Sequence, residues 1–260
     1  MIRSLSKQEY DLLSKFAVRN VNVISMKDIK EVSCFSDGKI RVMLHRLQKK
    51  GWLERIKKGT YLIVPIEGRD GWAEHPFVVL PNLVKNYYVS YRSALAYYGF
   101  TEQIPFYIFS ATTERKNSLN FQGYIYRFAR MDERKFFGFE KTKISGVEIN
   151  VADKEKAVID CIDKEEYAGS IIETFRAIKD NTKQFDFVKM INYAVKMKSK
   201  SLIRRLGYLL NLAGQDAKEL ENKTGKFRHI YLSNVLPKRK VKLNKKWKLI
   251  LNIEENELSK

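Results

Sequence analysis

The residues with the clearest chemical potential in this sequence are lysines and arginines gathered toward its two ends, because such side chains bind phosphate. The 260 residues include 49 Lys and Arg against 30 Asp and Glu, a net charge of +19. Residues 222–253 hold ten basic and no acidic side chains, residues 1–66 carry most of the remaining excess, and the middle of the chain is almost balanced. A protein of this charge attracts polyanions through electrostatic steering and counterion release. The composition therefore predicts a nucleic-acid partner.

One predicted helix presents a basic face. Ser36 can cap its N-terminus, and Gly51 suits the left-handed position after its last turn. The inward positions, at helical spacing, are Ile40, Met43, Leu44 and Leu47. The outward face consists of Lys39, Arg41, Val42, His45 and Arg46. A helix that presents Arg and His outward fits the major groove of DNA, so we expect these five residues to contact DNA there.

A β-hairpin is predicted directly after this helix. Trp52–Ile56 and Thr60–Val64 are β-prone runs, and Lys57, Lys58 and Gly59 join them. Gly59 permits the positive φ that a short hairpin turn needs. Because the hairpin tip can reach a neighbouring phosphate or the minor groove, we expect Lys57 and Lys58 to contact DNA.

Two shorter predicted helices precede these elements. Ser6 and Ser25 each begin a capping box, ahead of helices over residues 7–18 and 26–32. Three short helices followed by a hairpin is the order of a winged helix-turn-helix, so we assign residues 1–66 to a DNA-binding domain. Winged helices also serve as protein–protein modules, but the basic residues on both the helix and the hairpin tip favour DNA.

The remainder of the chain is predicted to form one α+β domain over residues 77–260, after a polar linker at 67–76. Strands are predicted at 106–111, 121–128, 147–151, 230–232 and 247–253. Helices are predicted at 90–98, 153–163, 167–178, 185–197 and 201–213. The fold class of the whole protein is therefore α+β, with an N-terminal winged helix-turn-helix followed by a mixed α+β domain.

The basic segment 222–253 belongs to this second domain. We expect four of its residues to add contacts to the DNA backbone, namely Lys238, Arg239, Lys240 and Lys242. The alternative is a solvated, lysine-rich surface. The absence of acidic residues from a stretch of this length favours the DNA role.

The sequence lacks the catalytic patterns of common hydrolases. His45, His75 and His229 are scattered, and no HExxH, GxSxG or Gly-rich phosphate loop is present. Two Glu-x-Lys triplets, beginning at Glu114 and Glu133, leave open a restriction-endonuclease-like, metal-dependent nuclease. Because such triplets arise by chance in a highly charged chain, we expect a protein that is not an enzyme and uses no cofactor and no metal.

Carboxylates are dense in one further stretch: Asp153, Glu155, Asp160, Asp163, Glu165 and Glu166. Lysines alternate with them, so we expect a charged, exposed helix in place of a magnesium site. Aromatic side chains cluster at residues 87–88, 97–98 and 106–109, where their spacing predicts core positions. Stacking of these rings on single-stranded bases, in an RNA-binding protein, is the alternative.

The two cysteines, Cys34 and Cys161, lie far apart, which argues against a disulfide scaffold and a cysteine-based zinc cluster. No stretch approaches the roughly 20 apolar residues of a membrane span. We therefore expect a cytoplasmic protein with no membrane contact.

Several segments, in this order, resemble the AbiEi antitoxin family. They are Phe16–Val64 with Leu44-His45-Arg46-Leu47 and Lys58-Gly59-Thr60-Tyr61, then Tyr88–Gly99, Val151–Asp160, Arg205–Leu210 and Trp247–Ile250, which together span nearly the whole chain. The resemblance implies a transcriptional regulator that represses its own promoter by binding inverted repeats, as a homodimer on DNA. It also implies an antitoxin of a type IV toxin–antitoxin pair, with a nucleotidyltransferase-like toxin as functional partner. Tyr98 stands where the family commonly has a histidine.

Overall fold

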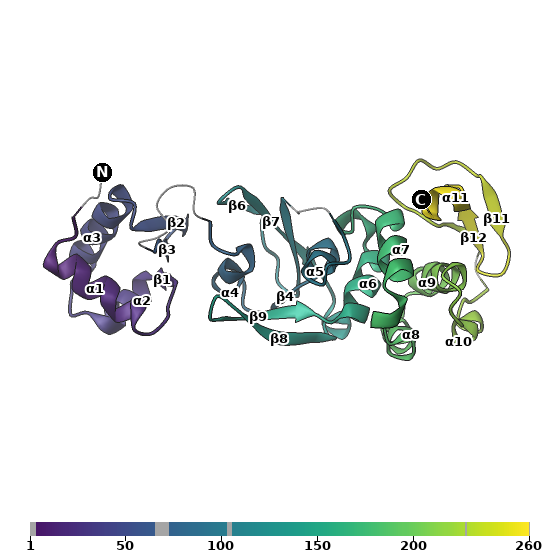
Figure 1. Ribbon diagram of the computed structural model, residues 1–260, viewed down its shortest axis with the longest axis horizontal. Helices are drawn as coiled ribbons and strands as arrows, with labels where there is room; N and C mark the ends of the chain where they lie inside the picture. Colours follow the sequence, from purple (N-terminus) through teal and green to yellow (C-terminus); the bar gives the residue numbers. More distant parts are fainter. Residues whose placement is uncertain (1–3, 66–72, 103–105, 227, 260) are drawn as a thin grey trace. The chain divides into compact units, whose positions relative to one another are not determined.

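The computed structural model describes residues 4–65, 73–102, 106–226 and 228–259. The chain forms two compact units, Met1–Lys85 with Lys143–Glu148, and Asn86–Thr142 with Ile149–Lys260. Figure 1 shows the helices and strands in chain order; the fold is mixed α+β with a winged helix-turn-helix at the N-terminus, as predicted. The domain limits at residues 66 and 77 stay a prediction, because residues 66–72 lie outside the described ones.

The winged helix-turn-helix in the first unit contains three helices and a three-stranded sheet of order β1-β3-β2. Its elements are α1 (Lys7–Ala17), β1 (Val23–Ser25), α2 (Met26–Val32), α3 (Asp37–Lys49), β2 (Leu53–Lys57) and β3 (Thr60–Ile63). A 3₁₀ helix, Pro76–Val79, and α4 (Leu80–Leu83) follow. The serine caps are confirmed, because the hydroxyls of Ser6, Ser25 and Ser36 each accept a hydrogen bond from the backbone N–H three residues later. Strand β1 was not predicted.

A β-bulge interrupts strand β2 of the hairpin. Arg55 is paired with Tyr61 and Lys57 with Thr60, so Ile56 is the extra residue on the bulged strand. Leu53 and Ile56 are both buried, at a spacing of three that a regular strand does not allow on one face. Because of this bulge, Lys57 does not share the face of Arg55, as it would in a regular strand.

A buried ion pair joins α1 to the end of α3. The Nζ of Lys50, the residue after α3, donates to Glu9 Oε2 at 2.6 Å, and Glu9 is only 2% exposed. The same carboxylate accepts from the Ser6 N–H at 2.7 Å and so completes the capping box of α1. Burial raises the pKa of Glu9, but the hydrogen bonds from Lys50 and Ser6 outweigh it and lower that pKa below its ordinary value of 4.5.

We expect Glu9→Gln to destabilise the first unit by about 1–3 kcal/mol, because the substitution leaves Lys50 and the Ser6 N–H with a neutral acceptor. Since the folded pKa is lowered, the carboxylate stabilises the fold above pH 4.5, and this contribution is lost as the pH falls through the folded pKa. The difference between wild type and variant should therefore shrink in acid. Hydrogen exchange of the α1 and α3 amides at several pH values measures this difference in stability. The matched control is Asp11→Asn, a substitution at an exposed position of α1.

A six-stranded mixed sheet of order β6-β7-β5-β4-β9-β8 forms the framework of the second unit, except that residues 143–148, around the turn between β8 and β9, belong to the first unit. Its strands are β4 (Tyr87–Val89), β5 (Tyr107–Thr112), β6 (Leu119–Phe121), β7 (Tyr124–Arg130), β8 (Phe139–Ile144) and β9 (Val147–Ala152). Strands β5 and β7, and β4 and β9, are parallel, whereas β4–β5 and β6–β7 are antiparallel. The helices are α5 (Tyr91–Tyr97), α6 (Lys154–Asp163), α7 (Ile171–Asp180), α8 (Phe187–Lys196), α9 (Lys200–Leu212) and α10 (Lys218–Glu221). A small sheet of β10 (Ile230–Tyr231), β12 (Leu249–Leu251) and β11 (Lys242–Asn244), with α11 (Glu255–Ser259), ends the chain.

Two predicted elements of this unit differ from the observed ones. The predicted strand 121–128 is in fact a hairpin, because β6 ends at Phe121 and a two-residue turn leads into β7. The predicted helix 167–178 starts later: Glu165–Tyr167 form a 3₁₀ turn, and Ser170 caps α7 by accepting from the Glu173 N–H at 3.1 Å.

The carboxylate-rich helix α6 is buried, so the prediction of an exposed, charged helix is wrong. The buried carboxylates of this stretch are Asp153, Glu155, Asp160 and Glu165. Lys156, fully buried, donates from Nζ to Asp160 and, at 2.9 Å, to Tyr88 Oη. Asp160 also accepts from Ser90 Oγ at 2.7 Å and from Tyr88 Oη at 3.0 Å. The Lys156–Asp160 pair has the i,i+4 spacing of a helix, and hydroxyl groups on β4 and at the start of α5 satisfy the remaining hydrogen-bonding capacity of this buried pair.

The C-terminal segment is held against α9 by two buried arginines. Arg204 donates to the carbonyl oxygens of Thr224 and Arg228 at 3.0 and 2.9 Å. Arg205 donates to the carbonyl oxygen of Tyr231 at 3.2 Å. Burial lowers the pKa of both guanidiniums from its ordinary value. These bonds satisfy carbonyls of an irregular segment that lacks extensive secondary structure of its own.

Trp247 of the C-terminal segment also packs against α9. Its indole ring is 1% exposed and lies against Gly207 of α9, and its Nε1 donates to Asn211 Oδ1 at 3.0 Å. A side chain at position 207 would place its Cβ closer than 3.0 Å to three carbon atoms of that ring. Glycine at this position of α9 is therefore required by the close approach of the indole.

Candidate nucleic-acid interface

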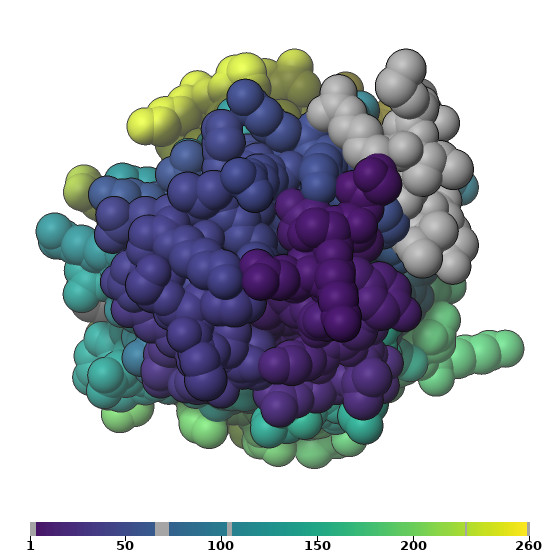
Figure 2. Space-filling view, turned by 90° about the vertical axis from the view of Figure 1, so that its left-hand side faces the viewer, coloured from purple at the N-terminus to yellow at the C-terminus, as the bar shows by residue number. Residues whose placement is uncertain are grey.

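The outward face of α3 carries all five residues that the sequence predicted for it. Ile40, Met43, Leu44 and Leu47 are confirmed as buried. The exposed side chains opposite them are Lys39, Arg41, Val42, His45 and Arg46. Figure 2 shows the surface of this N-terminal region in purple to blue.

Neighbouring contacts hold the start of α3. Lys39 Nζ lies 4.1 Å from the centre of the Phe35 ring, and Lys30 bridges to Asp37 at 2.7 Å. The hydrogen bond from Lys30 lowers the pKa of Asp37, and the positive charge of Arg41 acts in the same direction. Asp37 is thus ionised at neutral pH, which is favourable in the first turn of a helix.

The two hairpin lysines differ in environment. Lys58 is exposed in a two-residue turn whose second residue, Gly59, has φ of +76°. Lys57 is half-buried, and its Nζ donates to the Asn82 carbonyl oxygen at 2.6 Å. Of the predicted tip residues, Lys58 alone therefore projects from the turn.

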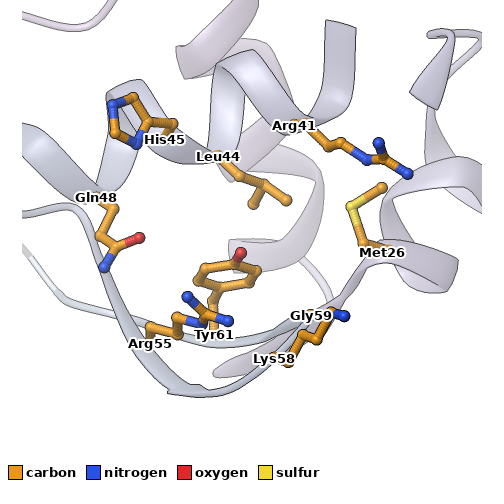
Figure 3. A pocket seen from close by; sticks show the side chains of 9 residues that line it. All are labelled: Met26, Arg41, Leu44, His45, Gln48, Arg55, Lys58, Gly59 and Tyr61. Atoms are coloured by element: carbon orange, nitrogen blue, oxygen red, sulfur yellow. The ribbon is translucent and has the colours of Figure 1, made fainter. Parts of the chain in front are cut away.

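A groove of about 550 Å³ separates α3 from the hairpin. Figure 3 shows Arg41, His45 and Gln48 projecting from the helix on one side and Arg55, Lys58 and Tyr61 from the hairpin on the other. None of the described residues that line it is acidic. Arg55 was not predicted as a contact residue. Its position in the groove depends on the bulge at Ile56, and the sequence gives no local sign of that bulge.

The predicted C-terminal contacts lie in the second unit. Arg239 bridges to Glu257 at 3.4 Å and Lys242 to Glu255 at 3.0 Å, with acids that follow the basic segment. Lys238 and Lys240 are exposed and make no ion pair with the described residues. Part of the positive charge of this segment is therefore neutralised within the protein.

Glu114 and Glu133, on which the nuclease alternative depends, lie in different parts of the second unit. Glu114 accepts a weak hydrogen bond, 3.5 Å, from the Asn86 N–H, and Glu133 starts a short 3₁₀ turn. In the described part of the chain, no three His, Cys, Asp or Glu side chains form a group that could hold a metal ion.

The aromatic clusters divide between core and surface. Tyr87, Tyr88 and Phe109 are buried as predicted, whereas Tyr97, Phe106 and Tyr107 are exposed by 40, 74 and 38%. The prediction that these rings all lie in the core is therefore wrong for three of them.

The part of the chain that forms the groove is similar to a known protein family. Residues 11–64 match the AbiEi antitoxin family of transcriptional regulators. The matched residues extend from within α1 to just beyond β3, and so include both sides of the groove. Within the described ranges, no helix is long and apolar enough to cross a membrane.

Nearly the whole chain, including the residues beyond 64, is similar in fold to a solved structure. The chain resembles the crystal structure of the Rv2827c protein from Mycobacterium tuberculosis, with a TM-score of 0.71, 13% sequence identity, and coverage of 99% of this chain and 96% of that chain. At this identity the likeness concerns the fold alone. Comparison of the sequence with curated proteins gives no match.

Proposed function

We propose that this protein is a transcriptional regulator that binds double-stranded DNA with α3 in the major groove. The exposed basic face of α3, beside a groove whose described lining residues include no Asp or Glu, is the observation that carries the proposal. We place the protein in the cytoplasm and assign it no catalytic role. If it binds DNA in this way, log K falls steeply with log salt, by about 0.9 for each phosphate contacted. A nearly flat slope, or a preference for single-stranded RNA, would contradict the proposal.

We further propose that two copies bind an inverted repeat in the promoter of the protein's own gene and repress it. One recognition helix reads only a short half-site, and a symmetric operator matches a pair of copies related by a two-fold axis. Footprinting on that promoter, combined with the mass of the complex in solution, gives the repeat and the number of copies bound.

Arg41 and Arg46 are expected to read bases. Each can donate two hydrogen bonds to a guanine edge, so Arg41→Ala and Arg46→Ala should each cost about 1–3 kcal/mol on the operator and little on unrelated duplexes. Lys58→Ala should weaken both duplexes alike, because a phosphate contact carries no sequence information. Titrations on operator and scrambled DNA measure the difference. Equal behaviour of the helix and hairpin variants on the two duplexes would show that α3 is not the recognition helix.

An antitoxin role is the second candidate, because the matched family consists of AbiEi antitoxins. A nucleotidyltransferase-like toxin would then be the functional partner. Growth of cells that express such a toxin from a neighbouring gene, with this protein or with its Arg41→Ala variant, separates protection from DNA binding.

A further inference from the structure

The groove between α3 and the β2–β3 hairpin has the chemistry of a phosphate site. Three cationic side chains, Arg41, Arg55 and Lys58, line it from two sides. The side chains of Arg55 and Lys58 make no hydrogen bond or ion pair with any residue that the structure describes. Two positive charges of the hairpin thus face the groove without a partner among the described side chains.

Strand geometry explains why Arg55 and Lys57 have different environments. Residues two apart in a regular strand point to the same face. The bulge at Ile56 breaks this rule, so that Arg55 stays opposite Tyr61 and lines the groove, while Lys57 reaches Asn82. Bulges commonly re-aim a side chain toward a functional surface, and here the bulge separates one groove residue from one internally bonded residue.

The geometry of duplex DNA indicates which group occupies such a groove. One sugar–phosphate strand separates the major groove from the adjacent minor groove. When α3 lies in the major groove and the hairpin reaches toward the minor groove, this strand must pass between them. Arg55 and Lys58 of the hairpin then face this strand from the side opposite to α3.

We infer that the DNA strand between the two grooves lies in this cleft, and that Arg55 binds one of its phosphates. The inference rests on the proposed DNA-binding function and adds to it a positioning residue. The planar guanidinium of Arg55 suits bidentate binding of a phosphate, and that contact fixes the register of α3 on the duplex. Arg55 therefore contributes affinity for any duplex, whereas the bases are read by α3.

The test compares Arg55→Gln with Arg19→Gln in the full-length protein. Arg19 is exposed near the end of α1 and lies outside the groove, so both variants lose one arginine charge from the same unit. The probes are a duplex from the promoter of the protein's own gene and a scrambled duplex of equal length, each titrated at several KCl concentrations. Arg55→Gln should lower the affinity for both duplexes about tenfold and make the salt slope shallower by about 0.9. Arg19→Gln should stay within about twofold of wild type.

A second measurement identifies the phosphate itself. Single methylphosphonates, which are neutral, are placed in turn along the scrambled duplex. At one position the substitution should weaken wild-type binding but cause no further loss in Arg55→Gln. A slope unchanged by Arg55→Gln, or an equal loss in Lys57→Gln, would overturn the inference while leaving the proposed function in place. Failure of the wild-type protein to bind either duplex would overturn both.

Discussion

Gly207→Ala is expected to destabilise the second unit by at least about 2 kcal/mol. The new methyl group would lie closer than 3.0 Å to three carbons of the Trp247 ring, which is 1% exposed and bonded to Asn211, so the ring cannot move aside cheaply. Overpacking costs about 1–3 kcal/mol and at times more, and a Cβ well inside 3.0 Å of a ring carbon places this substitution at or above the upper end of that range. The higher helix propensity of alanine recovers only about 1 kcal/mol.

Urea unfolding followed by circular dichroism measures this loss. Gly38→Ala in α3 is the matched control, because Gly38 is also helical but a Cβ there would meet no described atom within 4 Å apart from its chain neighbours and the backbone of its own helix. That variant should be neutral or more stable by up to about 1 kcal/mol. In a Trp247→Leu background, Gly207→Ala should cost much less than in the wild type. An equal cost in both backgrounds would show that the indole is not the obstacle.

Lys156→Met is expected to cost about 3–5 kcal/mol, a larger loss of stability than that from Gly207→Ala. The change leaves the Asp160 carboxylate fully buried without its cation, and removal of one member of a buried pair is far more costly than removal of both. The double variant Lys156→Met/Asp160→Leu should therefore be more stable than Lys156→Met alone. Lys154→Met, at a partly exposed position of the same helix, should change stability by no more than about 0.5 kcal/mol.

The effect of Lys156→Met should also depend on pH. Burial raises the pKa of Asp160, and Lys156 acts against that rise. Without Lys156 the folded pKa moves further above 3.8, so the folded state binds the proton more tightly than the unfolded chain. The variant should therefore approach wild-type stability as the pH falls through that raised pKa toward 3.8. Urea titrations between neutral and acid pH test this, and a constant difference would show that Asp160 is not the source of the cost.

The winged helix could be predicted because its determinants are short in range. The caps at Ser6, Ser25 and Ser36 bond to backbone groups three residues away, and the inward face of α3 follows from helical spacing. Strand β1 was missed because its three residues pair with β3, which lies beyond α2, α3 and β2 in the chain. The basic face of α3 follows from the sequence, but the groove beside it does not.

Most helices, the positive charge of both chain ends, and the basic residues of α3 and the hairpin turn could be predicted from the sequence. Three features became visible only in the folded chain: the burial of α6, the pairing of Arg239 and Lys242 with acids beyond the basic segment, and the different directions of Arg55 and Lys57. Capping and helical periodicity act over three or four residues along the chain. By contrast Ser90, Asn82 and Asn211, which bond to Asp160, Lys57 and Trp247, lie 70, 25 and 36 residues away from them.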